Sequence, residues 1–537
     1  MFGRMIALLF LLPFASQEGD LERLKLQVRA RLWGSREADR AAALRGLEEA
    51  KALDRPLSKA EFAAVEALIR AGRDYPEADP DEARYLTVTV RPGRAFRVLV
   101  SLPMAYAPGT PCPLMVVLPG GPVPSKGQSR RDCLSMADLW WELLKRSGWI
   151  LAAVEDTLSL RLGDGDLRYL TLQPGDVRAA IDAVAARFNV DPDRVCATGV
   201  SLGANYAIQF AAANPDAFAG IFPVVSEGES REAVLRHLAH ASVRLLNGAK
   251  DKNIRTIDGP RQMAAILKRL GVRSSYTEVA DRAHEGFGDH YAGALPWLEE
   301  ARRPAWPKVV TRVPHEGLFP VARRVFWIEA DGDQAVLRAE AKGQAIEVSA
   351  ACARRFTLRL SDALVDLDRP VTVSVNGTRA FEGRVARTLR AALETAARDR
   401  GIAAAAAVEV EVPQDLEASE KWLESLKPQA EAAPIPWWEF YARATLRERR
   451  PRAGIDGEKT AQGPVKVTTL DPAGPEAKAG VQRGDLVVGF EDEVFHREGG
   501  GLPLITEWLL RLPETPESYT LVLLPDGRPV RLRIPLR

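Results

Sequence analysis

Residues 194–207 read Arg-Val-Cys-Ala-Thr-Gly-Val-Ser-Leu-Gly-Ala-Asn-Tyr-Ala, and this stretch decides the fold of the region around it. The apolar run at 194–198 predicts a buried strand, and 204–207 begins a helical pattern. The pentapeptide at 199–203 places a serine on the tight turn between them. Because its two glycines permit backbone segments to cross closely, we expect Ser201 to project from the end of a sheet as a nucleophile. A glycine-rich turn with a structural serine is the alternative.

Short apolar runs on both sides of this turn alternate with helical patterns. Strands are predicted at 87–90, 97–101, 114–118, 150–154, 195–198, 220–225, 243–247 and 275–279, and helices at 134–146, 177–188, 204–213, 260–270 and 290–300. Such alternation indicates βαβ units and a mainly parallel sheet with helices on both faces. No helix separates the first two strands, so they are expected to form an antiparallel hairpin.

A serine nucleophile needs a base, and a neutral imidazole suits that task near neutral pH. The chain has six histidines, and His284 lies in the loop after the strand predicted at 275–279. Asp251 lies just after the preceding strand, so the order along the chain is serine, acid, histidine. Open α/β sheets build their sites beyond the carboxyl ends of strands. We therefore expect Ser201, Asp251 and His284 to form a catalytic triad.

Other assignments of base and acid are open. His290 is an alternative base, although it is expected to begin the last helix of this region. Asp281 and Asp258 are alternative acids. His237 and His240 lie on one helical face before the acid strand, so they are expected at the surface and not as metal ligands.

The strand predicted at 114–118 runs into Gly120 and Gly121. A backbone amide of one of these glycines, together with the amide of Leu202, is expected to form an oxyanion hole. Glycine leaves room there for the approaching carbonyl group.

Residues of about 84 to 302 resemble an α/β-hydrolase of the carboxylesterase, feruloyl-esterase and prolyl-oligopeptidase-like branch. The matching motifs at 176–182 and 189–195 precede the turn that carries Ser201. Those at 248–251 and 283–285 contain the expected acid and histidine. The resemblance implies that Ser201, deprotonated by His284, attacks an ester or amide carbonyl while Asp251 orients the imidazole. It implies no cofactor and no metal.

The whole chain has 537 residues, which suggests several domains at about 100–200 residues each. Its 73 Lys and Arg residues balance 72 Asp and Glu residues, so nucleic acid and anionic membranes are not expected partners. Four cysteines are too few for a disulfide scaffold. Cys112 and Cys133 are the pair open to oxidation, and Cys196 and Cys352 are expected in the core.

The first 17 residues have the layout of a secretory signal peptide, with Arg4 at a positive start, an apolar stretch at 5–14 and small residues after it. This stretch is shorter than the ~20 residues that span a membrane. Export to a periplasm or beyond is therefore expected, and a buried N-terminal helix is the alternative. A helical prefix is predicted at 20–80, with a capping box at 58–61.

Alternating strand patterns replace the helices after Pro307. Residues 306–412 predict a β-sandwich, with Asn376-Gly377 as a type I′ hairpin signal. A helix near 387–398 and a strand at 408–412 are expected to close it. A linker rich in Ala, Glu and Pro, with an aromatic helix, follows at 413–447.

Residues 448–537 resemble a PDZ domain of the bacterial, protease-associated kind, on the motif at 471–490. In such domains an extended peptide adds a strand to a sheet edge, and a backbone loop binds its terminal carboxylate. The resemblance assigns that loop to Arg452, Ala453, Gly454 and Ile455. A helix is predicted at 503–512.

Together these features predict an exported serine hydrolase that cleaves carboxylic esters and carries a PDZ-like module for a peptide or protein partner. A serine peptidase of the prolyl-oligopeptidase-like type is one alternative. Esterase activity is favoured, because only a short helical prefix stands where those peptidases usually carry a propeller. A catalytically inactive PDZ adaptor on a hydrolase scaffold is the other alternative.

Overall fold

The computed structural model describes residues 17–34, 37–91, 94–120, 131–155, 172–251, 258–314, 319–333, 335–399 and 402–413, and then 455–459, 465–470, 475–483, 485–490, 493–494, 518–523 and 530–535. The chain divides into two compact units, Met1–Arg168 with Leu172–Pro434, and Ile435–Arg537 with Tyr169–Thr171. The signal peptide expected at 1–17 and the linker expected at 413–447 lie outside the described residues except at their ends.

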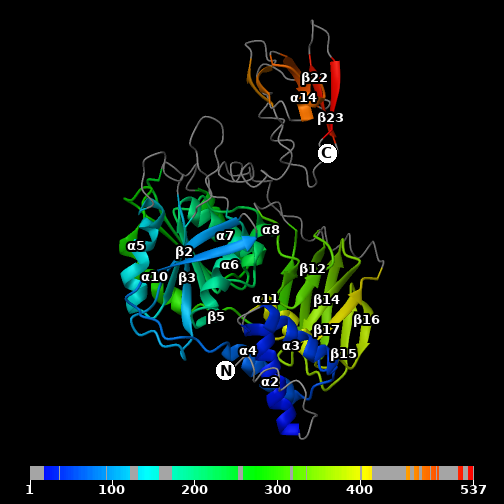
Figure 1. Ribbon diagram of the computed structural model, residues 1–537. Helices are drawn as coiled ribbons and strands as arrows, with labels where there is room; N and C mark the ends of the chain where they lie inside the picture. The colour runs from blue at the N-terminus through cyan, green and yellow to red at the C-terminus, as the bar shows by residue number, and fades with distance from the viewer. Residues whose placement is uncertain are drawn as a thin grey trace. The chain divides into compact units, whose positions relative to one another are not determined.

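An eight-stranded sheet forms the centre of the first unit (Figure 1). Its strands are β1 (Arg84–Arg91), β2 (Arg94–Ser101), β3 (Cys112–Leu118), β4 (Ile150–Glu155), β5 (Val190–Val200), β6 (Gly220–Val224), β7 (Ser242–Gly248) and β8 (Ser274–Val279). Their order is β1-β2-β4-β3-β5-β6-β7-β8. The expected hairpin of β1 and β2 is confirmed, and β2 is antiparallel to β4 while the remaining pairs are parallel.

Helices cover both faces of this sheet. The longer ones are α5 (Arg131–Arg146), α6 (Pro174–Ala185), α7 (Leu202–Ala213), α9 (Asp258–Arg269) and α10 (Tyr291–Glu299), and short α8 (Glu232–Leu235), η1 (Arg236–Leu238) and η2 (Gly288–His290) connect them. On one face, the rings of Trp140 in α5 and Tyr291 in α10 stack with centroids 4.3 Å apart. All seven residues of β3 are buried, as a central strand covered on both faces requires. Strand order, antiparallel second strand and covering helices are those of an α/β-hydrolase fold, as the sequence predicts.

Two further sheets follow in the same unit. The five-stranded one has the order β16-β15-β13-β12-β9, with β9 (Val309–Arg312), β12 (Val336–Lys342), β13 (Ala345–Ala351), β15 (Val371–Val375) and β16 (Thr378–Gly383). The four-stranded one has the order β10-β11-β14-β17, with β10 (Arg324–Val325), β11 (Ile328–Ala330), β14 (Arg355–Leu360) and β17 (Ala406–Glu411). The helix α11 (Leu389–Arg398) precedes β17. The predicted β-rich region is present, and its arrangement as a β-sandwich stays a prediction.

Individual features of the β-rich region test the sequence predictions. Asn376 and Gly377 have φ values of 50° and 83°, the positive angles that a type I′ hairpin requires. The prediction of Cys352 in the core is wrong. It follows the last residue of β13 in a turn with φ of 53°, and its side chain is exposed, because the apolar pattern ends with the strand.

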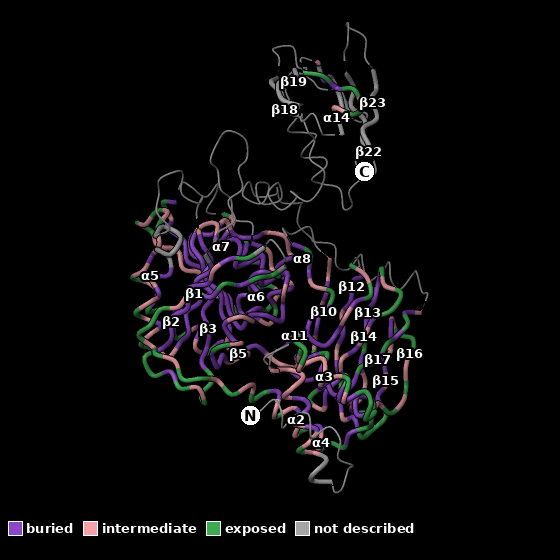
Figure 2. The backbone as a smooth tube through the Cα atoms, viewed as in Figure 1, coloured by how far each residue is buried: buried purple, intermediate pink, exposed green. Residues whose placement is uncertain are grey.

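The helical prefix packs against the β-rich region and shares its hydrophobic core. It comprises α2 (Gln17–Trp33), α3 (Glu37–Glu49) and α4 (Lys59–Ala71), and the predicted capping box of Ser58 and Glu61 is formed. Val28 and Val65 are fully buried in one cluster with Leu358 and Leu389. Figure 1 shows these helices beside α11, and Figure 2 shows the buried residues along them and the strands. The prefix is thus a layer of the β-rich region. Among the described residues, no helix combines the length and apolar character needed to cross a membrane.

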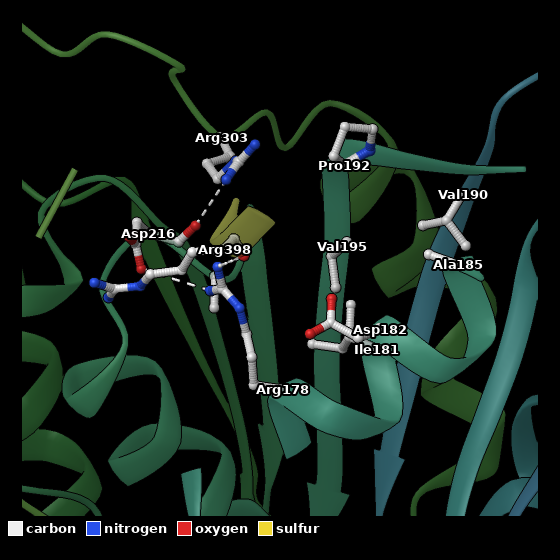
Figure 3. Close-up of a pocket in the computed structure, with 11 residues that line it drawn as sticks. Arg178, Ile181, Asp182, Ala185, Val190, Pro192, Val195, Asp216, Arg303 and Arg398 are labelled. Atoms are coloured by element: carbon white, nitrogen blue, oxygen red, sulfur yellow. Dashed lines mark hydrogen bonds and ion pairs between the residues drawn. The ribbon is translucent and has the colours of Figure 1, made fainter. Parts of the chain in front are cut away.

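A buried ion cluster of Arg178, Asp216, Arg324 and Asp399 joins the hydrolase part to the β-rich region. Asp399, just after α11, accepts from both Arg178 of α6 and Arg324 of β10. Arg178 also lies 3.7 Å from Asp216. Burial alone would raise the pKa of Asp399, but the charges of Arg178 and Arg324 outweigh it and hold the pKa below its ordinary value. Figure 3 shows Arg178 and Asp216 in the wall of an adjoining pocket of about 40 Å³.

The second unit contains a sheet of short strands. They are β18 (Ile455–Lys459), β19 (Val465–Leu470), β20 (Leu486–Phe490), β21 (Glu493–Val494), β22 (Ser518–Leu523) and β23 (Val530–Pro535), with the short helix α14 (Pro475–Lys478). The order is β18-β19-β20-β22-β23, and β21 pairs with β20. Arg452, Ala453, Gly454 and the helix predicted at 503–512 lie outside the described residues, and Ile455 begins β18.

We predict that Asp399→Ala lowers the free energy of unfolding of the first unit by about 3–5 kcal/mol, because it leaves buried arginines without their carboxylate. Because the folded-state pKa of Asp399 is lowered, its contribution is present above the ordinary carboxyl pKa and is lost as acid lowers the pH through the folded pKa. Denaturant unfolding at several pH values, followed by tryptophan fluorescence, measures both the free energy of unfolding and its dependence on pH. Glu409→Ala, which breaks an exposed pair with Arg355, is the control and should have a much smaller effect. Equal effects of the two variants would contradict a stabilising role for the cluster.

Candidate active site

Ser201 occupies the turn between the end of β5 and the start of α7. Its φ of 59° and ψ of −118° are unusual for a residue with a side chain, and such strain costs about 1–3 kcal/mol. Backbone hydrogen bonds hold it in place. Its amide donates to the Val224 carbonyl at 2.9 Å, and its carbonyl accepts from the amides of Ala204 and Asn205. The side chain is partly exposed, as a nucleophile requires.

The two glycines of the pentapeptide are needed because backbone segments touch there. A Cβ atom on Gly199 would lie 2.4 Å from the carbonyl carbon of Gly203, and one on Gly203 would lie 2.6 Å from the Leu118 carbonyl oxygen. Side chains at these positions would collide with backbone atoms that cannot move away. The strand–serine–helix elbow predicted from the sequence is therefore present.

His284 and Asp251 form a hydrogen bond. The Nδ1 atom of His284 lies 2.7 Å from Oδ2 of Asp251. The Asp251 side chain is fully buried, and the His284 side chain is 23% exposed. Because an ionised carboxylate only accepts hydrogen bonds, Nδ1 carries the proton, and Nε2 is left free to accept one. This is the arrangement in which an acid orients a histidine base.

The alternative acids and base lie elsewhere. Asp258 is exposed and pairs with Arg261, and Asp281 is exposed on the loop before His284. His290 ends the short helix η2, with its Nε2 atom 3.8 Å from Asp289. Among these candidates the structure joins Asp251 to His284.

The loops that carry Asp251 and His284 are joined through their backbones. The amide of Ala249 donates to the Val279 carbonyl and that of Lys250 to the Arg282 carbonyl, each at 2.9 Å. A Cβ atom on Gly248 would lie 2.5 Å from the carbonyl oxygens of both Arg282 and Ala283. Glycine at 248 therefore allows the two loops to approach closely enough for the Asp251–His284 hydrogen bond.

The sequence analysis missed Arg282, whose side chain holds the loop that carries His284. Its guanidinium donates to both carboxylate oxygens of Glu285 and of Asp289, and lies 4.9 Å from the centroid of the Phe287 ring. These hydrogen bonds hold the pKa of Glu285 and Asp289 below their ordinary values. Arg282, two residues before His284, thus holds the segment that follows His284. The sequence signal for these contacts is the spacing, since Arg282 precedes Glu285 by three residues and Asp289 by seven.

The expected oxyanion donors are placed only in part. The Gly120 backbone lies against the elbow, since a Cβ atom there would lie 2.3 Å from the Val200 carbonyl oxygen. The Leu202 amide is the first of α7 and, among the described residues, has no acceptor, so it is available to an oxyanion. Gly121 lies outside the described residues. The described residues also show no hydrogen bond between Ser201 and His284, and such bonds often tighten only with substrate bound.

The expectation that His237 and His240 lie at the surface is wrong. His237 is buried, and its Nε2 atom accepts from the Val313 amide at 3.1 Å. His240 is partly buried with Nε2 2.9 Å from the Val309 carbonyl oxygen, and burial lowers its pKa. Both side chains contact β9 and the residue after it, a partner distant in sequence that their own helical pattern does not reveal.

Within the described residues, the cysteines are not placed as reactive groups and no side-chain group is arranged as a metal site. Cys112, Cys196 and Cys352 are free thiols, while the side chain of Cys133 is not among those described. Burial raises the pKa of Cys112, and that of Cys196 to about 12, so neither favours a reactive thiolate. No described group of His, Cys, Asp or Glu side chains is arranged to hold a metal ion.

Comparison with known proteins gives partial structural matches. No family model and no curated protein matches the chain. A thermostable esterase has 19% identity and a TM-score of 0.34, over 42% of this chain and 64% of that one. The dipeptidyl peptidase 4 of Porphyromonas gingivalis has 14% identity and a TM-score of 0.32, over 45% and 38%. A thermophilic esterase from Thermogutta terrifontis, with propionate bound, has 17% identity and a TM-score of 0.32, over 41% and 93%. The chain therefore spans less than two thirds of the first two structures.

We predict that Gly248→Ala separates the acid loop from the histidine loop and weakens the Asp251–His284 hydrogen bond. The expected result is loss of the low-field proton signal of His284 Nδ1–H in the NMR spectrum of the folded variant. Gly293→Ala, a helix position where an added Cβ meets nothing within 4 Å, is the control and should keep the signal. An unchanged signal in Gly248→Ala would show that the close approach is not required.

Proposed function

We propose that the protein is a serine hydrolase that cleaves carboxylic esters through an acyl-enzyme on Ser201. The observation that carries the proposal is the hydrogen bond from His284 to the buried Asp251, on loops at the same edge of the sheet as the strained Ser201 turn. Carboxyl ends of parallel strands meet at one edge, so the three residues share the part of the fold where such sites are built. Strained backbone at a residue with a side chain is typical of functional sites, and a purely structural serine does not require it.

In the proposed reaction, Nε2 of His284 takes the proton of the Ser201 hydroxyl as its oxygen attacks the carbonyl carbon of the ester. Asp251 keeps Nδ1–H oriented and stabilises the imidazolium that forms. The amides of Leu202 and of Gly120 or Gly121 bind the oxyanion of the tetrahedral intermediate, as such donors do at a helix N-terminus. His284 then returns the proton to the leaving alcohol. Water repeats the sequence on the acyl-enzyme and releases the acid.

Ester substrates are favoured over peptides by the parts of the chain that flank the catalytic region. The prefix of α2, α3 and α4 is buried against the β-rich region, and the described residues contain no propeller of repeated four-stranded blades. Such a propeller is what the resemblance associates with peptidases of this branch. Peptide hydrolysis is the alternative activity, and the comparison of ester and peptide substrates below distinguishes the two.

Ser201→Ala is expected to lower kcat for p-nitrophenyl esters by about 10⁴–10⁶-fold, and Asp251→Asn by about 10⁴-fold, because each removes part of one catalytic unit. The measurement compares p-nitrophenyl esters of graded acyl length with peptide amides. Asp281→Asn, which changes an exposed carboxylate on the histidine loop, is the matched control and should retain activity. Turnover of peptides alone would favour the peptidase, and folded wild-type protein inactive on both classes would support the inactive adaptor.

We also propose that the second unit binds a peptide C-terminus in the manner of a PDZ domain. The support is a sheet with β18 at its edge, beginning at Ile455 of the expected carboxylate loop, together with buried Val467, Val481 and Val487 as a small core. An edge strand is the element to which an extended peptide adds.

An array of C-terminal peptides is expected to contain ligands of the full-length protein. Amidation of the terminal carboxylate should weaken their binding by about tenfold or more, since it removes the charged group that the loop would bind. Fluorescence polarisation measures this. Binding that is insensitive to amidation, or no binding by any peptide, would leave the second unit with a packing role.

A further inference from the structure

Residues 285–290, which follow His284 and which we call the histidine segment, lie against one side chain of α5. The Leu139 side chain packs on the backbone of the segment at two glycines. A Cβ atom on Gly286 would lie 2.9 Å from its Cδ1 atom, and one on Gly288 would lie 3.0 Å from its Cδ2 atom. The two methyl groups of one leucine therefore meet the chain on either side of Phe287.

The close approach to α5 explains why both positions are glycine. Neither Gly286 nor Gly288 has the positive φ at which glycine is otherwise favoured. What each position requires is space, because a side chain there would meet the methyl groups of Leu139. The sequence of the segment is therefore matched to a leucine on α5.

Phe287, between the two glycines, anchors the histidine segment in the core. Its φ of 53° lies in the left-handed region, which a residue with a bulky side chain rarely adopts. Its side chain is buried in one hydrophobic cluster with Trp140 and Tyr291. Strained backbone of this kind persists only where the surrounding structure holds it. Burial of the ring and the contact of Leu139 with the neighbouring glycines both contribute to that hold.

The helix that carries Leu139 is itself fixed to the sheet. Trp140, the next residue, stacks on Tyr291 at the start of α10 with ring centroids 4.3 Å apart. Its ring also meets that of Phe222 in β6 edge-on at 5.8 Å. Because Trp140 and Tyr291 are each 1% exposed, these contacts lie deep in the core. Leu139 therefore belongs to a rigid support, which Figure 1 shows beside α10.

The direction of the His284 ring depends on the backbone that carries it as well as on Asp251. The hydrogen bond to Asp251 holds the Nδ1 atom. Before His284, the Arg282 carbonyl accepts from the Lys250 amide at 2.9 Å. After it, the ion pairs of Arg282 with the histidine segment lie near the surface, where such pairs contribute little. The contact with Leu139 supports the segment from the side of α5.

We propose that Leu139 is a positioning residue for His284 and keeps its imidazole in place for proton transfer from Ser201. The proposal rests on the proposed function, in which Nε2 of His284 is the base. A general base must lie within hydrogen-bond reach of the proton that it takes, at about 2.6–3.2 Å. A misplacement of ~1 Å can lower the rate by about 10²-fold. Leu139 thus acts on the rate through His284.

Leu139→Ala in the full-length protein tests the proposal. We expect kcat for p-nitrophenyl esters to fall about tenfold or more with KM nearly unchanged, because the loss concerns the base and not the binding of the ester. The low-field NMR signal of His284 Nδ1–H should broaden or disappear, since a looser segment exposes this hydrogen bond to exchange. Leu139→Met, which nearly conserves the volume, should retain most of both readouts.

Leu143→Ala is the matched control. Leu143 lies one turn further along α5 and is partly buried against the same hydrophobic cluster as Leu139. Its truncation should lower the free energy of unfolding to a similar extent, but kcat and the His284 signal should stay as in the wild type. Leu139→Val should show the effects of Leu139→Ala at smaller size, and it replaces Leu139→Ala if that variant does not fold.

An unchanged kcat or an unchanged His284 signal in folded Leu139→Ala would overturn the proposal, and so would equal losses in Leu143→Ala. The NMR signal requires no turnover. It therefore decides whether Leu139 positions His284 even if the wild-type protein hydrolyses no ester, a result that would contradict the proposed function alone.

Discussion

Where β5 ends and α7 begins, three backbone segments lie in direct contact, and this contact constrains the rest of the catalytic region. Gly199 touches Gly203 across the turn, Gly203 touches Leu118 and Pro119 at the end of β3, and Gly120 touches the Val200 carbonyl. No side chain fits between these segments, and the turn holds Ser201 at positive φ. The same contact brings the Gly120 backbone and the Leu202 amide near the nucleophile.

The parallel sheet then determines where the remaining groups lie. Loops after neighbouring strands β7 and β8 leave the same edge, and Gly248 lets them pass closely enough for two backbone hydrogen bonds. Arg282 holds the outer part of the histidine loop. Far from this edge, the cluster around Asp399 and the contacts of His237 and His240 with the segment at β9 attach the β-rich region. The catalytic edge therefore depends on backbone contacts, and the attachment of the β-rich region includes buried polar ones.

Features that depend on local sequence signals were predicted, whereas contacts between residues far apart in the chain were missed. The eight strands, the elbow and the Asp251–His284 pair were predictable, because short apolar runs, glycine spacing and chain order are local signals. The pairing of Arg178 with Asp399 joins residues 221 positions apart, and no local pattern predicts it. For the same reason the burial of His237 and the packing of the prefix against the β-rich region were missed. Gly248 begins the matching motif at 248–251, but its close approach to the carbonyl oxygens of Arg282 and Ala283 on another loop has no local signal.

The most direct test of the central claim is the position at which an organophosphonate attaches to the folded protein. The account predicts one adduct per chain, located by tandem mass spectrometry on Ser201, formed at a rate that falls sharply in His284→Ala. That variant removes the base and leaves the serine in place. An adduct on another residue, or an equal rate in His284→Ala, would contradict a nucleophile at Ser201 activated by His284.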